Sequence, residues 1–249
     1  MTTKYGLTRP HLFTELPNLM KKLSSVFLRT TVLLCVLSSN SFAAVPPFKP
    51  GETIRYSIHK LLLQGEATLV YKGPCVFKNK KALLIVFTSK AFNFYDQEKI
   101  YLGVEDFRPI HVDRNINIFG RKERIFEGYF DGRIEVTKID AGGRKSKQTI
   151  ENKNKVDNIY GFIYRYRAQG SFKEGDDLNI HLPTKDLTIK LLRQEKVDAA
   201  KQVFDSYYME STASGYKIWF DAGSHKLPLR ISDATGPGDT VMTMKDYRE

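Results

Sequence analysis

The strongest constraint on the fold is a hairpin pattern over residues 124–139. Two runs in which apolar and polar residues alternate, Arg124–Phe130 and Arg133–Ile139, flank the dipeptide Asp131-Gly132. This dipeptide suits the positive φ angles of a two-residue type I′ turn, and alternation is the period of a strand. The segment therefore predicts two antiparallel strands joined by a tight turn.

The register of this hairpin places apolar side chains on both faces. Tyr129 opposes Ile134 and Glu127 opposes Val136, while Phe126 points to the other face together with Phe130. A sheet with one face in water needs apolar residues on the opposite face only. We therefore expect the second face to be covered by another sheet, a helix or a ligand.

Similar short patterns recur along the chain, and the content of Tyr and Phe favours strands. Strands are expected at 53–58, 65–71, 81–89, 98–104, 109–114, 178–182, 187–193, 202–210 and 240–247, with two more in 216–231. The run Ala82–Phe87 is continuously apolar, which predicts a strand covered on both faces. Residues 195–204 could be partly helical, 141–155 read as a Gly- and Lys-rich loop, and 236–238 as a turn. The pattern predicts an all-β or β-dominated fold.

One segment, Asp157–Arg167, is the candidate helix. Asp157 can cap its first amides, and Arg167 places a positive charge near its last turn. Four residues share one face at helical spacing: Ile159, Tyr160, Ile163 and Tyr164. Aromatic residues at 160, 162, 164 and 166 also fit a strand. Asp157 and Arg167 could recognise a ligand, although their capping roles explain them more simply.

The first 43 residues carry the features of a signal peptide. A positive region containing Lys21, Lys22 and Arg29 precedes the apolar run 31–37, and Ser41-Phe42-Ala43 places small residues where signal peptidase reads. The apolar run is shorter than the roughly 20 residues that a membrane-spanning helix needs. We expect export and cleavage after Ala43, with a buried N-terminal helix as the alternative.

The predicted cleavage defines the domain layout. Residues 44–50 contain three prolines and are expected to form an extended linker, followed by a single β-rich domain over 51–249. Starting at Met20 would give a more compact signal peptide. Without an anchor after cleavage, the protein is expected to be periplasmic or secreted.

Charge and cysteine content narrow the partners of the mature chain. Removing residues 1–43 takes five basic and one acidic residue from totals of 39 and 28, which leaves a net charge near +7. Nucleic acid does not fit an exported protein, whereas anionic lipid headgroups or an acidic envelope polymer do. Simple solubility is the alternative explanation of the charge. Cys75 alone remains after cleavage, so the mature chain can form no intramolecular disulfide.

A series of short motifs follows a fixed order between residues 51 and 247. They are Gly51–Tyr56, Gly65-Glu66-Ala67, Phe107-Arg108-Pro109, Val156–Tyr160, Tyr166-Arg167, Lys173–Asp176, Ile218–Asp221 and Leu227–Ile231. In this order they resemble the bacterial exported family catalogued as domain of unknown function 3108. The resemblance implies an envelope protein with a curved antiparallel sheet, an open barrel or a sandwich-like fold with one short helix. It implies no established activity and no catalytic residues.

The chain lacks the sequence patterns of common catalytic and metal sites. It has no Gly-x-Ser-x-Gly elbow and no phosphate-binding loop. The mature histidines lack a second ligand at metal spacing: His59, His111, His181 and His225. Asp221 and His225 bracket a turn and could pair, but they read more simply as turn formers. We therefore expect no catalytic residues, no metal, no cofactor and no enzymatic activity.

Three functions of different classes remain. The first is a non-enzymatic binding module for an apolar or amphiphilic envelope ligand, such as a lipid or acyl chain. The second is a structural or assembly partner of another periplasmic or outer-membrane protein. A hydrolase without a recognisable motif ranks last.

The candidate ligand-binding residues are Trp219, Tyr160, Tyr164 and Arg167. Alternation places Trp219, the sole tryptophan, on the face opposite Ile218. Aromatic side chains bury about 150–250 Å² in folded proteins, so a purely solvent-facing position would waste a large apolar ring. We expect Trp219 to lie under the candidate helix, against Tyr160 and Tyr164, or to line the concave surface of the sheet.

Overall fold

The computed structural model describes residues 46–249 except 62, 213–214 and 235–238. The predicted signal peptide and the predicted turn at 236–238 lie outside the described residues. The described residues belong to one compact unit.

Fourteen strands and one helix make up the described part of this unit. Their bounds are β1 Thr53–Lys60, β2 Leu63–Phe77, β3 Lys80–Ala91, β4 Phe94–Leu102, β5 Pro109–Ile118, β6 Arg121–Phe130, β7 Arg133–Ile139, β8 Lys145–Glu151, α2 Ile159–Gln169, β9 Asp177–Leu182, β10 Lys185–Ala199, β11 Gln202–Ser211, β12 Tyr216–Asp221, β13 Pro228–Asp233 and β14 Thr240–Arg248.

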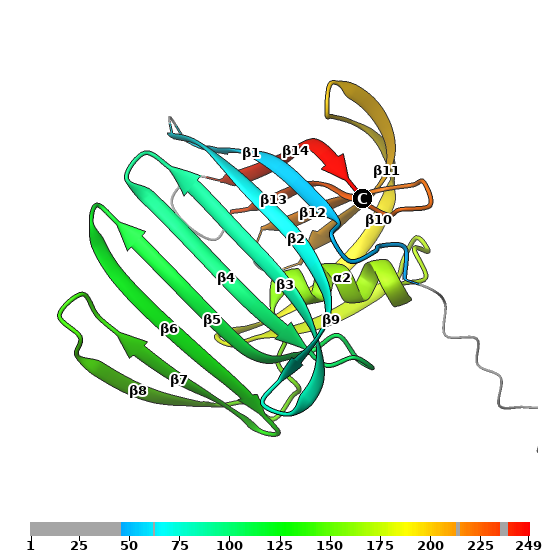
Figure 1. The fold of residues 1–249 in the computed structure, drawn as a ribbon. Helices are drawn as coiled ribbons and strands as arrows, with labels where there is room; N and C mark the ends of the chain where they lie inside the picture. Colours follow the sequence, from blue (N-terminus) through cyan, green and yellow to red (C-terminus); the bar gives the residue numbers. More distant parts are fainter. Residues whose placement is uncertain (1–45, 62, 213–214, 235–238) are drawn as a thin grey trace, which may run out of the picture. The chain divides into compact units, whose positions relative to one another are not determined.

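All strands belong to one antiparallel sheet with the order β8-β7-β6-β5-β4-β3-β2-β1-β14-β13-β12-β11-β10-β9. Every neighbour pair is consecutive in the chain except β1 and β14, which join the first strand to the last. The two edges, β8 and β9, are therefore the strands that flank α2 in the sequence. The sheet is curved, and α2 lies on its concave side (Figure 1). The predicted all-β class with a curved antiparallel sheet and one helix is confirmed.

The core lies between α2 and the sheet. The helix buries Phe162, Ile163 and Tyr164 completely or nearly so, against strand residues of the same face such as Ile85 and Phe220. Alternation explains why: each strand sends every second side chain to the concave side. The helix is thus the second layer that the apolar face of the sheet requires.

The helix begins one residue later than the sequence indicates. Asn158, not Asp157, has the extended backbone of an N-cap, and its side chain accepts hydrogen bonds from the amides of Tyr160 and Gly161. Asp157 is buried and pairs instead with Arg165 and Arg108. The prediction of a helix was therefore correct, and the predicted cap was wrong.

Strands β5–β8 extend past the helix and form what we call the open wing (Figure 1). The only buried residues on these four strands are Pro109, Val112 and Ile134. The remaining apolar side chains on the helix-side face of the wing, such as Ile125 and Val136, are half-exposed. One part of the sheet is therefore sealed by α2, and the other part is not.

The hairpin β6–β7 has the predicted register. Tyr129 pairs with Ile134 and Glu127 with Val136. The other face of this hairpin carries no second layer of structure. Arginine side chains cover its two rings instead: the Arg124 guanidinium lies 4.5 Å from the Phe126 ring centroid, and that of Arg133 lies 5.1 Å from Phe130. Among the described residues, these two cations cover this face, and neither another sheet nor a helix does.

Four further expectations differ from the structure. The predicted loop 141–155 contains β8, and residues 195–204 are strand and turn, not helix. Gly132 alone has a positive φ in the 131–132 turn, so that turn is not type I′. The predicted linker carries Phe48, which is buried against Tyr71 and Tyr164 and so belongs to the core. On Ala82–Phe87 one face is buried, while Leu84 and Val86 on the other are half-exposed.

Candidate functional site

Trp219 lies on the convex face of the sheet, away from the helix. Its neighbours Ile218 and Phe220 are fully buried, and Phe220 contacts Tyr166 of α2 at a centroid distance of 5.6 Å. Trp219 itself stacks on Tyr208 at 4.9 Å, and its Nε1 donates a 2.6 Å hydrogen bond to Glu195. The expectation that Trp219 lies beneath the helix or lines the concave surface is therefore wrong.

Arg167 and Tyr164 meet at a buried ion pair near the last turn of α2. The Arg167 guanidinium donates to both carboxylate oxygens of Glu52, at 2.6 and 2.8 Å, and both side chains have no exposed surface. The Tyr164 hydroxyl donates to the same carboxylate at 3.1 Å, and Arg167 also donates to the carbonyl of His225. This arrangement fastens the helix to the segment before β1.

No ligand can reach this ion pair without opening the core. The ring of Phe48 lies 5.0 Å from the Arg167 guanidinium and closes the pair on one side. Burial raises the pKa of Tyr164 well above its ordinary value, and the nearby Glu52 carboxylate adds to the rise. The polar groups of Arg167 and Tyr164 are thus occupied by contacts within the protein.

Tyr160 lies at the other end of the helix, beside a second polar cluster that we call the Glu98 cluster. The cluster consists of Asp96, Glu98, Arg114 and Glu127. The Arg114 guanidinium donates to both oxygens of Asp96 and lies 3.4 Å from Glu98. Tyr160 stacks on Phe87 at 4.1 Å, and its pKa is raised well above the ordinary value by burial and by the nearby carboxylate of Glu98.

The Glu98 cluster holds three carboxylates and one arginine, and the consequence falls on Glu98. Its side chain is 13% exposed. Its pKa is raised to about 7, chiefly by burial; the Asp96 and Glu127 charges contribute to the rise, while Arg114 and a hydrogen bond with Asn158 oppose it. An unfavourable charge is relieved here by binding a proton. The cluster therefore adjoins the open wing with a carboxyl that is partly protonated near neutral pH.

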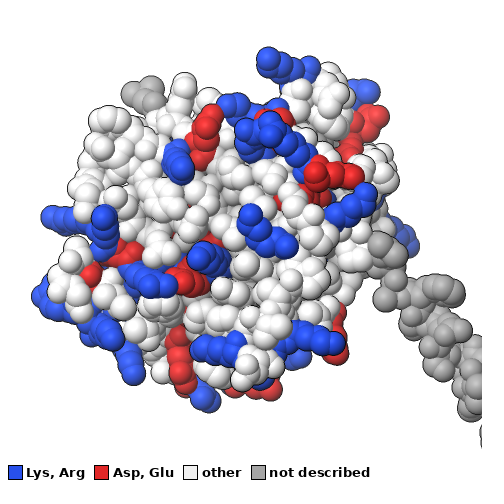
Figure 2. Space-filling model, viewed as in Figure 1, with Lys and Arg blue, Asp and Glu red and all other residues white. Residues whose placement is uncertain are grey.

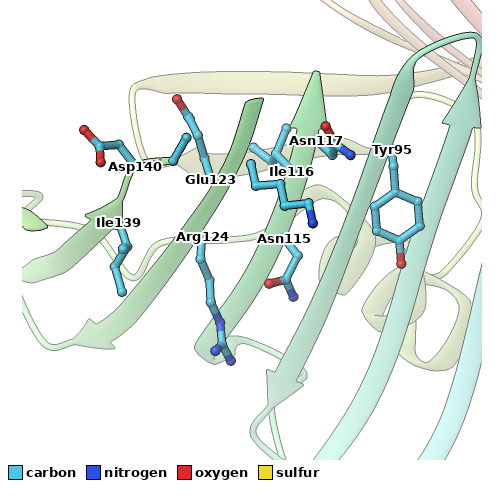
Figure 3. A pocket seen from close by; sticks show the side chains of 10 residues that line it. Tyr95, Asn115, Ile116, Asn117, Glu123, Arg124, Ile139 and Asp140 are labelled. Carbon is cyan, nitrogen blue, oxygen red and sulfur yellow. The ribbon is translucent and has the colours of Figure 1, made fainter. Parts of the chain in front are cut away.

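The described surface has shallow depressions. One of 350 Å³ lies on β4–β7 near their tips, with amide side chains of Asn115 and Asn117 in its wall (Figure 3). The buried Oδ1 of Asn117 has no hydrogen-bond partner among the described residues. Arg124, which also borders the depression, donates two hydrogen bonds of 3.0 and 2.7 Å to the Asp113 carboxylate. The walls of the depression combine polar side chains with apolar ones such as Ile116 and Ile139.

A wider cleft of 660 Å³ lies where the sheet stops short of closing. It is lined by β8 residues such as Ile150, by residues 151–154, and by the β9–β10 turn, including Pro183 and Lys185. The amide of Asp157 donates to the carbonyl of His181, so the segment after β8 crosses toward β9. The cleft is thus the mouth of the open sheet, next to the wing.

The four predicted site residues are not brought together. Tyr160 and Tyr164 lie on α2 at different polar clusters, Arg167 is bound to Glu52, and Trp219 lies on the opposite face. Asp221 caps its own turn by accepting from the Gly223 amide, so the suggested pair with His225 does not form. The described residues contain no group of histidine, cysteine or carboxylate side chains that could hold a metal ion.

Sequence reasoning missed the residues that make the two polar clusters. Glu52 stands in a turn-like Gly-Glu pair, and Glu98 and Arg114 alternate with apolar residues on ordinary strands. The one available signal was charge at inward positions: in β4, Asp96 and Glu98 share the parity of Ile100. Period-two alternation then predicts that both carboxylates face the core.

Neither the properties of the helix nor the comparisons with known proteins indicate an activity for the chain. Across the described ranges, no helix combines the length and apolarity needed to cross a bilayer. No curated protein matches the chain. A solved crystal structure of a beta-barrel-like protein of domain of unknown function DUF1849 from Brucella abortus is similar, with a TM-score of 0.48 and 8% identity over 80% of this chain and 97% of that one.

The family model described as protein of unknown function (DUF3108) matches residues 41–245, which is most of the chain. This is the family that the ordered motifs predict. The chain therefore belongs to the DUF3108 family of proteins of unknown function.

Proposed function

We propose that the protein is an exported envelope protein that binds an amphiphilic ligand, a lipid or an acyl chain, and catalyses no reaction. The observation that carries the proposal is the open wing. Its helix-side face presents half-exposed apolar side chains, Ile116, Ile125, Val136 and Ile150, on four neighbouring strands. In the helix-covered part of the same sheet, equivalent positions are buried.

Polar groups border this apolar surface on the same face. Lys138 pairs with Glu123 at 2.7 Å, and the Glu98 cluster lies where the wing meets the helix. An apolar strip with charged groups at its margins suits a molecule that has both a chain and a headgroup. The basic balance of the mature chain and the predicted signal peptide also support an amphiphilic envelope ligand.

The test is to identify and then displace the ligand. Full-length protein is purified without detergent, and its organic extract is analysed by mass spectrometry; binding of a fluorescent fatty acid is then titrated. The Val136→Asp variant places a charge on the apolar strip and should lose at least about tenfold in affinity. Val203→Asp alters a 60% exposed valine outside the wing and serves as the matched control.

Two outcomes would contradict the proposal. One is a purified protein that carries no lipid and shows no saturable fatty-acid binding. The other is equal binding by wild type, Val136→Asp and Val203→Asp, which would place any lipid elsewhere on the surface.

The alternative is an assembly partner that adds a strand to the sheet. It is favoured by the two sheet edges, since each of β8 and β9 has only one strand neighbour among the described elements. Exposed Lys145 and Lys147 on β8 oppose such pairing, because charged side chains on an edge discourage strand addition. Site-specific crosslinking from Thr149 in an envelope extract would reveal a partner protein if this alternative holds.

A further inference from the structure

Exposed apolar residues gather on three hairpin turns at one end of the sheet. The residues, which we call the tip row, are Leu61 (78% exposed), Leu63 (62%), Phe92 (81%), Ile118 (45%) and Phe119 (73%). They occupy the β1–β2, β3–β4 and β5–β6 turns, which lie along one side of the sheet in Figure 1.

Hydrogen bonds hold two of these turns together. The amide of Phe119 donates to the carbonyl of Asn93 at 2.8 Å, and the β4–β5 ladder continues to the pair Phe94–Ile118 at the tips. Phe92 and Phe119 therefore project from adjacent, mutually fixed turns.

Folding does not explain the side chain of Phe119. Its φ is +50°, a left-handed backbone region that Gly or Asn adopts at lower cost than an aromatic residue. Its ring is largely exposed, so it contributes little to the core. An aromatic residue that is disfavoured by its backbone and gains little from burial is better explained by a contact outside the chain.

The charged residues next to the tip row in the sequence are basic, although Lys90 faces Glu66 across the β2–β3 ladder. Lys60, Lys90 and Arg121 each stand within two positions of a tip-row residue, and no acidic residue does. Arg121 and its neighbour Lys122 are exposed and make no ion pair with a described residue, whereas the nearby carboxylates of Glu123 and Asp140 are already paired with Lys138 and Arg144. Figure 2 shows Lys and Arg gathered along the margin where the tips of β5–β6 and β7–β8 lie.

The opposite end of the sheet provides an internal comparison. There, the exposed apolar residues are smaller or covered: Val76, Val104 and Val203 are valines, and acids stand close to Val104, Phe130 and Val203 in the sequence. The Arg133 guanidinium also covers the Phe130 ring. Among the described residues at the two ends of the sheet, bare aromatic rings next to cations occur at the tip row.

From this combination we infer that the tip row docks the protein onto an anionic lipid bilayer. Phe92 and Phe119 insert into the headgroup boundary, and Lys90, Arg121 and Lys122 face the lipid phosphates. Aromatic and aliphatic side chains with adjacent cations are the composition that binds at such a surface. The tip row includes the end of β5 and the β5–β6 turn and so adjoins the open wing, but the inference rests on the turns and does not depend on the ligand proposed for the wing.

The experiment is co-sedimentation of the full chain with vesicles of phosphatidylcholine, with and without 30% phosphatidylglycerol, added as the lipid probe. The double variant Phe92→Ser/Phe119→Ser should bind anionic vesicles at least about tenfold more weakly than wild type, because it removes the two rings that insert into the bilayer. Arg121→Gln/Lys122→Gln should weaken binding to anionic vesicles only. Every variant keeps the same N-terminal segment, so a difference in vesicle binding between variants arises from the substituted residues.

Control variants distinguish vesicle binding by the tip row from nonspecific binding by other exposed apolar residues. Phe130→Ser/Val203→Ser removes exposed apolar residues at the other end and should bind like wild type. Val136→Asp is measured alongside to detect any binding of vesicles through the open wing. The tip residues are exposed, so their variants should melt within about 1–2 °C of wild type. Three results would overturn the inference: wild type that ignores phosphatidylglycerol, equal losses in the tip and control variants, or binding that moves with Val136→Asp alone.

Discussion

The two parts of the sheet differ in what covers the same alternating pattern. In the helix-covered part, β1–β4 and β9–β14, inward residues such as Ile54, Ile85 and Ile218 have no exposed surface. In the open wing, inward residues such as Ile125 and Val136 are half-exposed. Alternation therefore decides which way a side chain points, and α2 decides whether it is buried.

The two parts also differ in how their buried carboxylates are paired with arginine. The helix-covered part contains one carboxylate for one guanidinium, Glu52 and Arg167, joined by two hydrogen bonds. Where the wing begins, Arg114 pairs with Asp96 and lies beside Glu98, and Glu127 adds a third carboxylate near Glu98. The first arrangement is closed and stabilises one conformation, and the second retains an excess of carboxylate that responds to pH.

The largest effect should come from breaking the closed ion pair. Arg167→Met leaves the Glu52 carboxylate buried without its partner and should lower the free energy of unfolding by about 3–5 kcal/mol in urea titrations. The control is Arg124→Met, which removes a half-exposed guanidinium bound to Asp113 and should cost about 0–1 kcal/mol. Equal losses would show that the buried pair contributes no more than a surface pair.

A double variant sharpens this result. Glu52→Gln/Arg167→Met removes both charges, so its loss should be smaller than the sum of the two single losses. Strict additivity would mean that the two side chains act independently despite their contact.

The same truncation should cost different amounts in the two parts. Ile218→Ala, in the helix-covered part, should destabilise by about 2–5 kcal/mol because it opens a cavity in a packed core. Ile125→Ala, in the open wing, should cost about 1 kcal/mol because that side chain is only partly buried. Chemical denaturation of both variants gives the comparison. A loss at Ile125 as large as that at Ile218 would show that something covers the wing.

The raised pKa of Glu98, at the edge of the wing, predicts that the stability of the protein depends on pH. Burial raises its pKa from 4.5 to about 7. Between these values the folded protein holds a proton that the unfolded chain releases. Stability due to this group is therefore fully present below about pH 4.5, declines up to about pH 7, and is constant above, with a total change of at most about 3 kcal/mol.

The variant Glu98→Gln removes this titration. It should match the wild type near pH 5 and exceed it in melting temperature at pH 8, where the wild type bears the buried charge. Glu66→Gln, at a fully exposed carboxylate paired with Lys245, should retain the wild-type decline. A decline in Glu98→Gln equal to that of wild type would assign the pH response to another group.

The sequence predicted the sheet better than it predicted the site. The hairpin register at Tyr129–Ile134 followed from alternation and a short turn, which act locally. The β8 strand was missed because its pattern, Lys-Ser-Lys-Gln-Thr-Ile-Glu, has one apolar residue and lies at an edge of the sheet where little is buried. Local patterns detect strands to the extent that one face is buried.

The polar clusters could not be predicted because they join distant segments. Glu52 and Arg167 are 115 positions apart, and their pairing depends on how α2 crosses the sheet. The position of Trp219 shows the same limit. Its face was correctly predicted as opposite to Ile218, but the sequence could not indicate that the helix lies on the Ile218 side.

The smallest expected effect concerns Trp219, and it tests which face binds lipid. Trp219 stacks on Tyr208 and donates to Glu195 on the convex face, whereas the proposed ligand lies on the helix-side face of the wing. Its emission should therefore stay unchanged when a fatty acid is added to the wild type. Trp219→Phe keeps the ring contact, loses one hydrogen bond and should cost about 1 kcal/mol. In that background Val136→Trp supplies a single reporter in the wing, whose emission should shift to shorter wavelength and saturate with added fatty acid. A response from Trp219 together with a silent reporter at position 136 would move the lipid site to the convex face.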